Sequence, residues 1–196
     1  METHVAELKE RLGETGTELH PKPDYQVWWN GVAAMFVHGL FLLIHLLTFG
    51  RVEVDFDDFW TTLGGVVYAP RDHEVDLEDP EDFAVVCHEL AHRYDDEAHG
   101  WRYRLGYIVS GRARARWEIR AYALHLIALY RVTGEVPADR PRYFADRVSG
   151  PAYLWAADRQ EALRTFAAIA DALRTGRLAA TVWDPNEERF EGFLEG

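Results

Sequence analysis

The sequence predicts an α+β domain that is mostly helical, with a small antiparallel sheet ahead of its central helix. Val52, Val54 and Phe56 alternate with acidic residues, and a second short apolar run, Val66 to Tyr68, follows a pair of glycines. A period of two residues is typical of half-buried strands. Beyond Pro80 the apolar residues recur every three or four positions, which indicates packed helices.

The order of the elements follows from turn residues and helix caps. Residues 1–24 are polar and contain glycines and prolines, so we expect a frayed or short helix followed by a linker. Residues 25–196 show no shift in composition and are predicted to form a single domain with helices toward its C-terminal side. Those helices are expected at about Asp79–Tyr94, Arg112–Thr133, Arg142–Val148 and Asp158–Thr175.

The composition argues against several classes of protein. Of the 196 residues, 48% are hydrophobic, which is typical of a globular chain rather than a disordered one. A formal net charge of -12 argues against a protein that binds nucleic acid through a broad basic surface. The first 20 residues contain no apolar signal segment, and Cys87 is the only cysteine. We therefore expect a reducing, cytoplasmic location, with Cys87 as a small buried hydrophobe.

The stretch from Gly31 to Phe49 is apolar and roughly long enough to span a bilayer. Three interpretations are open. It forms a buried core helix, it spans a membrane as part of residues 28–49, or its His38 and His45 contribute to a metal site. We favour the buried helix, because two central histidines are costly in lipid and the rest of the chain provides no second span.

The motif that carries chemistry is His88-Glu89-Leu90-Ala91-His92. On a helix, His88 and His92 lie one turn apart on the same face, so their imidazoles can bind one divalent metal ion, usually Zn²⁺. Glu89 stands beside the first histidine, where its carboxylate can take a proton from a metal-bound water. The motif therefore predicts a zinc site with Glu89 as general base.

A catalytic zinc site needs a third protein ligand, and two residues qualify. Glu118 lies on the next long predicted helix, where small Ala121 lets the two helices approach closely. A carboxylate in the middle of a core helix has a reason to be buried if it binds a cation. His99 is the alternative third ligand, because a third histidine can follow a turn shortly after the motif helix.

Residues 62–128 resemble a minimal gluzincin-type zinc metallopeptidase. A short strand, an acidic loop, the HExxH helix and a Glu-x-x-Ala helix follow one another in that order. The spacing from His92 to Glu118 is similar to that of the ImmA/IrrE-like family, and the His-Gly-aromatic sequence at His99 is similar to that of the SprT-like family. The resemblance implies a zincin-like fold and peptidase activity.

The chain departs from the gluzincin pattern at two positions. Arg93 follows the second histidine, where these peptidases usually carry an uncharged residue. Tyr122 stands where a thermolysin-like enzyme places the aspartate that orients a histidine ligand. Asp95 or Asp96 is a candidate replacement for that aspartate.

The resemblance also implies roles for the motif residues. His88, His92 and Glu118 hold Zn²⁺, and Glu89 deprotonates the bound water that attacks a peptide carbonyl and then protonates the leaving amine. The oxyanion needs a further donor. The candidates are Tyr122 and His125, on the Glu118 face of their helix, followed by Tyr94, Tyr143 and Tyr153.

Three functions are compatible with these residues. The leading one is a zinc-dependent endopeptidase that acts on a peptide or protein substrate, with the strand Val66 to Tyr68 as an edge that pairs with extended peptide. The second is a non-catalytic or regulatory metal-binding module that keeps the HExxH fold. The third is a membrane-anchored zinc peptidase that uses residues 28–49.

Overall fold

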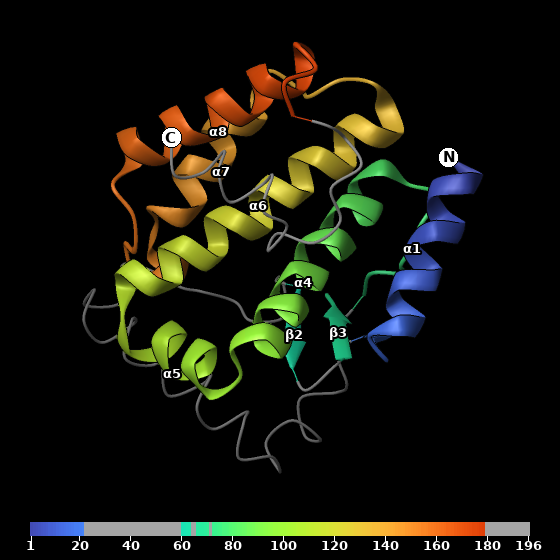
Figure 1. Cartoon of the computed structure of the whole chain (residues 1–196), viewed down its shortest axis with the longest axis horizontal. Helices are drawn as coiled ribbons and strands as arrows, with labels where there is room; N and C mark the ends of the chain where they lie inside the picture. The colour runs from blue at the N-terminus through green and yellow to red at the C-terminus, as the bar shows by residue number, and fades with distance from the viewer. Residues whose placement is uncertain (22–59, 64–65, 71, 179–196) are drawn as a thin grey trace.

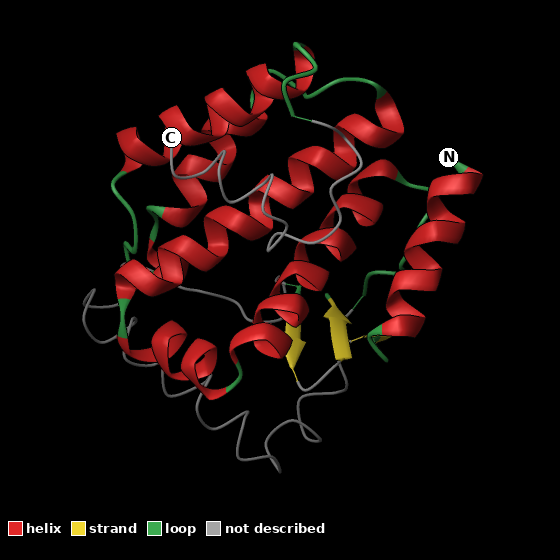
Figure 2. Cartoon of the chain, in the orientation of Figure 1, coloured by secondary structure: helices red, strands yellow, loops and turns green. Residues whose placement is uncertain are grey.

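The computed structural model of the chain describes residues 1–21, 60–63, 66–70 and 72–178. It confirms the predicted α+β class, because helices form most of these ranges and a small sheet lies at one side (Figure 2). The expected strand at residues 52–56 and the apolar stretch at 31–49 lie outside the described residues. No helix within the described ranges is long and apolar enough to cross a membrane. The helices are α1 (Glu2–Glu14), α4 (Pro80–His99), α5 (Trp101–Val109), α6 (Gly111–Thr133), α7 (Arg140–Val148) and α8 (Arg159–Arg174), with a 3-10 turn at Pro151–Tyr153.

The sheet is mixed rather than purely antiparallel, which corrects the prediction. Strand β3 (Val66–Ala69) lies in the middle, antiparallel to β2 (Thr61–Leu63) and parallel to β1 (Glu18–Pro21). Strand β1 occupies the segment expected to be a linker. The sequence did not predict this strand, because four residues are too few to show an alternating pattern. The prediction that Val66 to Tyr68 is an edge strand is wrong, since β3 has a partner strand on each side.

Helix α4 begins where the sequence predicts and ends later. The Asp79 side chain caps the helix by accepting from the backbone N–H groups of Glu81 and Asp82. The expected end at about Tyr94 is wrong, because the acidic pair that follows is compensated by arginines: Asp95 lies by Arg120, and Asp96 accepts two bonds from Arg104. The helix instead continues to His99 and is followed by Gly100 as its cap, where φ is 55°.

Helix α6 is the centre of the core. It packs along α4, while α7 and α8 cover its other side (Figure 1). Ser110 caps its start and Gly134, in the left-handed conformation, ends it. The apolar residues that recur every three or four positions along α6 are buried, and so are most of those along α8. The buried residues of the α6 stripe are Trp117, Ala121, Leu124 and Ala128.

Helix α1 belongs to the core rather than to a frayed end. Its Val5, Leu8 and Leu12 are buried in the same apolar cluster as α4 and α6. Arg131 of α6 bonds to Glu7, at 2.6 Å, which fixes the outer side of α1. The polar composition of residues 1–24 conceals this stripe, because three buried apolar residues in thirteen suffice for a helix that packs on one side only.

Candidate metal centre

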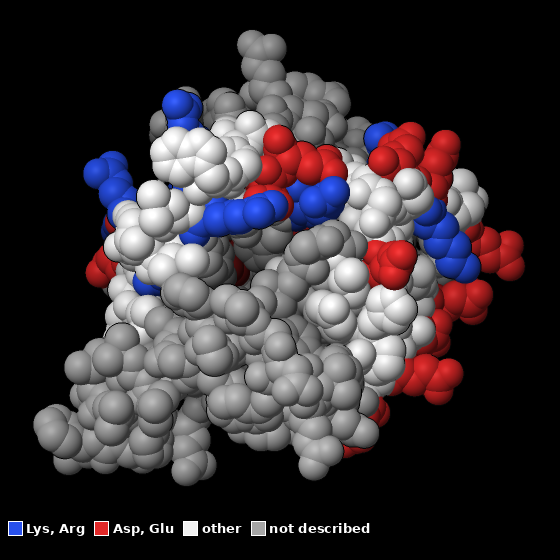
Figure 3. All heavy atoms as spheres, turned by 90° about the horizontal axis from the view of Figure 1, so that it is seen from below, with Lys and Arg blue, Asp and Glu red and all other residues white. Residues whose placement is uncertain are grey.

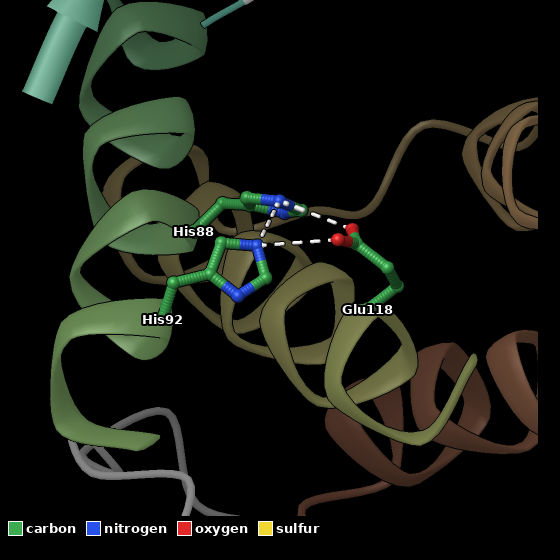
Figure 4. Close-up of side chains that lie close together, drawn as sticks. All are labelled: His88, His92 and Glu118. Carbon is green, nitrogen blue, oxygen red and sulfur yellow. Dashed lines mark hydrogen bonds and ion pairs between the residues drawn. The ribbon is translucent and has the colours of Figure 1, made fainter. Parts of the chain in front are cut away.

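Two histidines of the HELAH motif face each other on α4. The Nε2 atoms of His88 and His92 lie 3.2 Å apart, and both side chains are buried (Figure 4). The four-residue spacing on a continuous helix produces this arrangement, since residues i and i+4 share a face. The two nitrogens therefore point at one common position.

Glu118 of α6 points toward the same position from the opposite side (Figure 4). Its Oε2 atom lies 3.6 Å from Nε2 of His88, and its Oε1 atom lies 3.5 Å from Nε2 of His92. The side chain is 1% exposed. Ala121, one turn further along α6, is fully buried, and its role as a small residue at a close approach of the helices stays a prediction.

The three residues can hold a metal ion. Their ligand atoms all lie within 4.8 Å of one another. A tetrahedral metal with ligands at about 2.0–2.1 Å has ligand atoms about 3.3 Å apart, close to the 3.2, 3.5 and 3.6 Å in this site. Oε2 of Glu118 is buried and has no hydrogen-bond partner among the described residues. A buried oxygen without a partner is unusual, and a bound cation would satisfy it.

The protonation states also suit a cation. Burial lowers the pKa of His88 well below its ordinary value and lowers the pKa of His92, so both imidazoles are neutral and free to ligate. Burial raises the pKa of Glu118 to about 7, against the opposing effect of the phenols of Tyr107 and Tyr153. A buried carboxylate with a raised pKa has more to gain from a nearby cation than an exposed one.

The oxygens of Glu118 are positioned by residues from two other segments. The hydroxyl of Tyr107, on α5, donates to Oε1 of Glu118. Buried Arg114 donates to the backbone carbonyls of Tyr107 and Tyr153, so one guanidinium ties both tyrosine segments to the start of α6. Neither Tyr107 nor Arg114 was predicted from the sequence to support the site, although the i, i+4 spacing of Tyr103 and Tyr107 is a signal for an inward-facing aromatic pair.

His99, the alternative third ligand, lies outside the cluster. Helix α4 continues to His99 without a turn, and seven helical residues carry it about 10 Å along the axis from His92. Its side chain is exposed, and its ring lies 5.0 Å from that of Trp117. The structure thus brings Glu118 to the two histidines and leaves His99 away from them.

Glu89 is buried beside the ligands. Its Oε2 accepts a hydrogen bond from the hydroxyl of Thr62 on β2, at 2.6 Å. Its negative charge raises the pKa of His92, which burial otherwise lowers. The predicted general base is therefore held between the histidine helix and the sheet.

The predicted oxyanion donors occupy different surroundings. The ring of Tyr122 packs on that of His88, and its hydroxyl lies 3.0 Å from the hydroxyl of Tyr153. His125 is turned toward Glu81, with Nε2 of His125 3.7 Å from the carboxylate, and its ring lies 6.3 Å from that of His88. Of the lower-ranked candidates, Tyr153 adjoins Glu118, whereas Tyr143 is exposed on α7 and Tyr94 is half-buried on α4.

The departures from the gluzincin pattern leave the ligand cluster intact. Arg93 is turned away from the ligands, where it donates to the carbonyl of Thr15 and pairs with Glu97. Asp95 and Asp96 lie by arginines, as described above, and neither is bonded to a ligand histidine in the described structure. The Nδ1 atoms of His88 and His92 have no hydrogen-bond partner among the described residues.

Comparison of the chain with models of protein families, with curated proteins and with solved structures gives no match. Its function is therefore inferred from the residues of the site.

Proposed function

We propose that the chain is a zinc-dependent metallopeptidase of gluzincin type. The observation that carries the proposal is the convergence of two neutral imidazoles and one buried carboxylate at tetrahedral spacing, with Glu89 next to the first histidine. Two nitrogens and one oxygen from His88, His92 and Glu118 are a ligand set that zinc accepts in hydrolases, where it leaves a fourth position open.

Each protein group has a role in the proposed hydrolysis. A zinc ion held by the three ligands supplies a Lewis acid and lowers the pKa of water. Glu89 takes a proton from the attacking water and delivers it to the amine of the cleaved peptide bond. The hydroxyl of Thr62 holds the carboxylate of Glu89 in one orientation, which reduces the freedom that the base must lose during the reaction.

Strand β2 is the better candidate for binding an extended peptide. It lies at the end of the described sheet, next to β3, and its Thr62 contacts Glu89 directly. A peptide paired along the outer side of β2 would run past the general base. This assignment replaces the edge role that the sequence suggested for Val66 to Tyr68.

The hydroxyl of Tyr107 is better placed than Tyr122 or His125 to serve the oxyanion, to which it would donate when its single proton turns away from Glu118. It reaches the ligand cluster through its bond to Glu118, whereas Tyr122 is turned to Tyr153 and His125 to Glu81. Burial raises the pKa of Tyr107 well above its ordinary value, so the phenol stays protonated and remains a donor.

The burial of the site favours a second candidate function, a non-catalytic module in which zinc is structural. His88 and Glu89 are each 5% exposed and Glu118 is 1% exposed, so little of the site meets solvent or a substrate. Such a module would bind zinc with the same three residues and would not cleave peptides.

The substitution Glu89→Gln separates the two candidates. The zinc-loaded parent should cleave an unfolded protein substrate such as a denatured casein, and the variant should cleave it about 10²- to 10⁴-fold more slowly while it retains zinc. Glu97→Gln, on the exposed side of the same helix, is the matched control and should retain activity. Zinc binding without cleavage by the parent would favour the structural module, and equal cleavage by Glu89→Gln would refute the assigned general base.

A further inference from the structure

The segment from Trp101 to Trp117 contrasts in charge with the rest of the chain. It contains five arginines and no acidic residue, whereas the whole chain has a net charge of -12. Arg114 is buried and engaged with backbone carbonyls, but Arg102, Arg104, Arg112 and Arg116 are all exposed. Five of the 21 basic residues lie in these 17 positions, so the segment is locally basic within an acidic protein.

Helix α5, within this segment, has an exposed apolar face. Trp101, Leu105 and Ile108 are 68%, 50% and 59% exposed, and their spacing of four and three residues places them on one stripe of the helix. Val109, 69% exposed, extends the stripe at the C-terminal end. No residue of α5 is fully buried. Solvent-exposed aliphatic and indole side chains in a row are unusual on a surface that only water covers.

The charged residues of α5 lie on both sides of this stripe. Successive helical residues are 100° apart, so Arg102 and Arg104 fall on opposite flanks of the line through Trp101 and Leu105. Arg102 lies over the ring of Trp101, and Arg104 pairs with Asp96. In Figure 3 the acidic side chains gather mainly on the side of α1, while the side of α5 shows uncharged surface with basic side chains around it.

From this arrangement we propose that the outer face of α5 docks on an anionic bilayer surface as an interfacial helix. An apolar stripe with indole and aliphatic side chains, flanked by arginines, is the pattern of helices that lie in the membrane interface. Nucleic acid is the less suitable partner, because Leu105, Ile108 and Val109 present no flat ring for base stacking. Headgroup phosphates would meet the arginines while the stripe enters the acyl boundary.

The other face of α5 adjoins the metal centre. Tyr103 packs near the ring of His92, and Tyr107 bonds to Glu118. A bilayer bound to the outer face would therefore lie one helix diameter, about 10–12 Å, from the ligands. The proposal does not rest on the zinc chemistry, since metal-free protein presents the same outer face.

Sedimentation with lipid vesicles tests the proposal on the full chain. Vesicles of phosphatidylglycerol and phosphatidylcholine should bind the parent in low salt, and vesicles of phosphatidylcholine alone should bind it at least tenfold more weakly. The double variant Leu105→Ser/Ile108→Ser should reduce binding about tenfold or more. Arg102→Gln should reduce it about fivefold, which is the effect of one arginine near an anionic surface.

Matched controls make the outcome decisive. Tyr143→Ser removes an exposed aromatic on α7 and should leave vesicle binding unchanged. Circular dichroism and urea unfolding should show that the exposed substitutions leave the fold intact. Vesicle binding that survives the α5 variants would overturn the proposal, because it would place the contact elsewhere, for example in residues 31–49. Binding of a single-stranded oligonucleotide in preference to vesicles would equally overturn it.

Discussion

Two polar clusters are buried between α4 and α6, and they differ in how their negative charge is balanced. Asp95 of α4 lies 3.4 Å from the guanidinium of Arg120 of α6, so this carboxylate has a cation within the chain. In the other cluster Glu118 meets two neutral histidines and the phenols of Tyr107 and Tyr153. The same pair of helices thus contains one carboxylate paired with an arginine and one whose nearest partners are uncharged.

The difference shows what compensates the cost of burying each carboxylate. A charge taken out of water is stable when a counter-charge or good hydrogen bonds replace the solvent. Arg120 does this for Asp95, and the raised pKa of Glu118, about 7, shows that its partners do so incompletely. A divalent cation between His88, His92 and Glu118 would complete the second cluster in the way that Arg120 completes the first.

The largest expected effect comes from breaking the ion pair. Arg120→Met should lower the free energy of unfolding of the metal-free protein by about 3–5 kcal/mol, because buried Asp95 loses the positive charge of Arg120. The double variant Asp95→Leu/Arg120→Met should recover most of that loss. Urea denaturation measures both. A loss below about 1 kcal/mol for the single variant would mean that Asp95 does not depend on Arg120.

Glu118→Gln should act in the opposite sense on the metal-free protein. The folded-state pKa of Glu118 lies above its ordinary value, so ionisation at neutral pH costs stability, and a neutral amide avoids that cost. The variant should therefore be no less stable than the parent at pH 7.5 without metal.

The same variant should lose the response to zinc. Free zinc at about 1,000 times the dissociation constant raises the free energy of unfolding of the parent by about 4 kcal/mol, and Glu118→Gln should lose most of this increase. Denaturation with chelator and with zinc measures the difference, with Glu97→Gln as control. A variant that zinc stabilises as strongly as the parent would exclude Glu118 as a ligand.

Zinc affinity should depend on pH through Glu118. Metal and proton compete for the carboxylate, so the affinity should fall about tenfold per pH unit below pH 7 and level off above it. Because the pKa values of His88 and His92 are lowered, protons compete with zinc for these two imidazoles only at more acidic pH. A competition assay with a zinc-binding dye from pH 5.5 to 8 measures the slope, and a flat profile would contradict the expected competition.

Tyr107→Phe should have a smaller effect in the same cluster. Loss of the hydrogen bond to Glu118 should weaken zinc binding about tenfold, as for other residues that orient metal ligands. The bond lowers the pKa of Glu118, so its loss should move the break in the pH profile to higher pH. Tyr130→Phe, half-buried on α6, is the matched control. An unchanged break would show that Tyr107 does not act on Glu118.

The smallest expected effect belongs to Arg93→Gln. Arg93 bonds to Thr15 and Glu97, and neither of these residues is a predicted metal ligand. A partly exposed ion pair contributes about 0–1 kcal/mol to the stability of the fold. Zinc affinity should stay within about twofold of the parent. A larger change in zinc affinity would show that the positive charge of Arg93, directly after the second histidine, affects metal binding.

Much of the helical frame was predictable because its signals are local. Asp79 and Asp158 lie at the expected starts of α4 and α8 and cap them, and Gly134 ends α6. Helix α5 escaped prediction, because its apolar residues face outward and its inward face consists of tyrosines. Strand β1 escaped as well, since its pairing with β3 depends on residues distant in the chain.

The sequence by itself determined the two facing histidines and the neighbouring glutamate, because spacing on one helix is a local property. It also indicated Glu118, without excluding His99. Only the tertiary structure decided between them, since the reach of a third ligand depends on how α6 packs against α4 and on where α4 ends. The hydrogen bond from Tyr107 to Glu118 likewise depends on the tertiary structure, because Tyr107 lies on a different helix, α5, whose backbone carbonyl at Tyr107 accepts from Arg114.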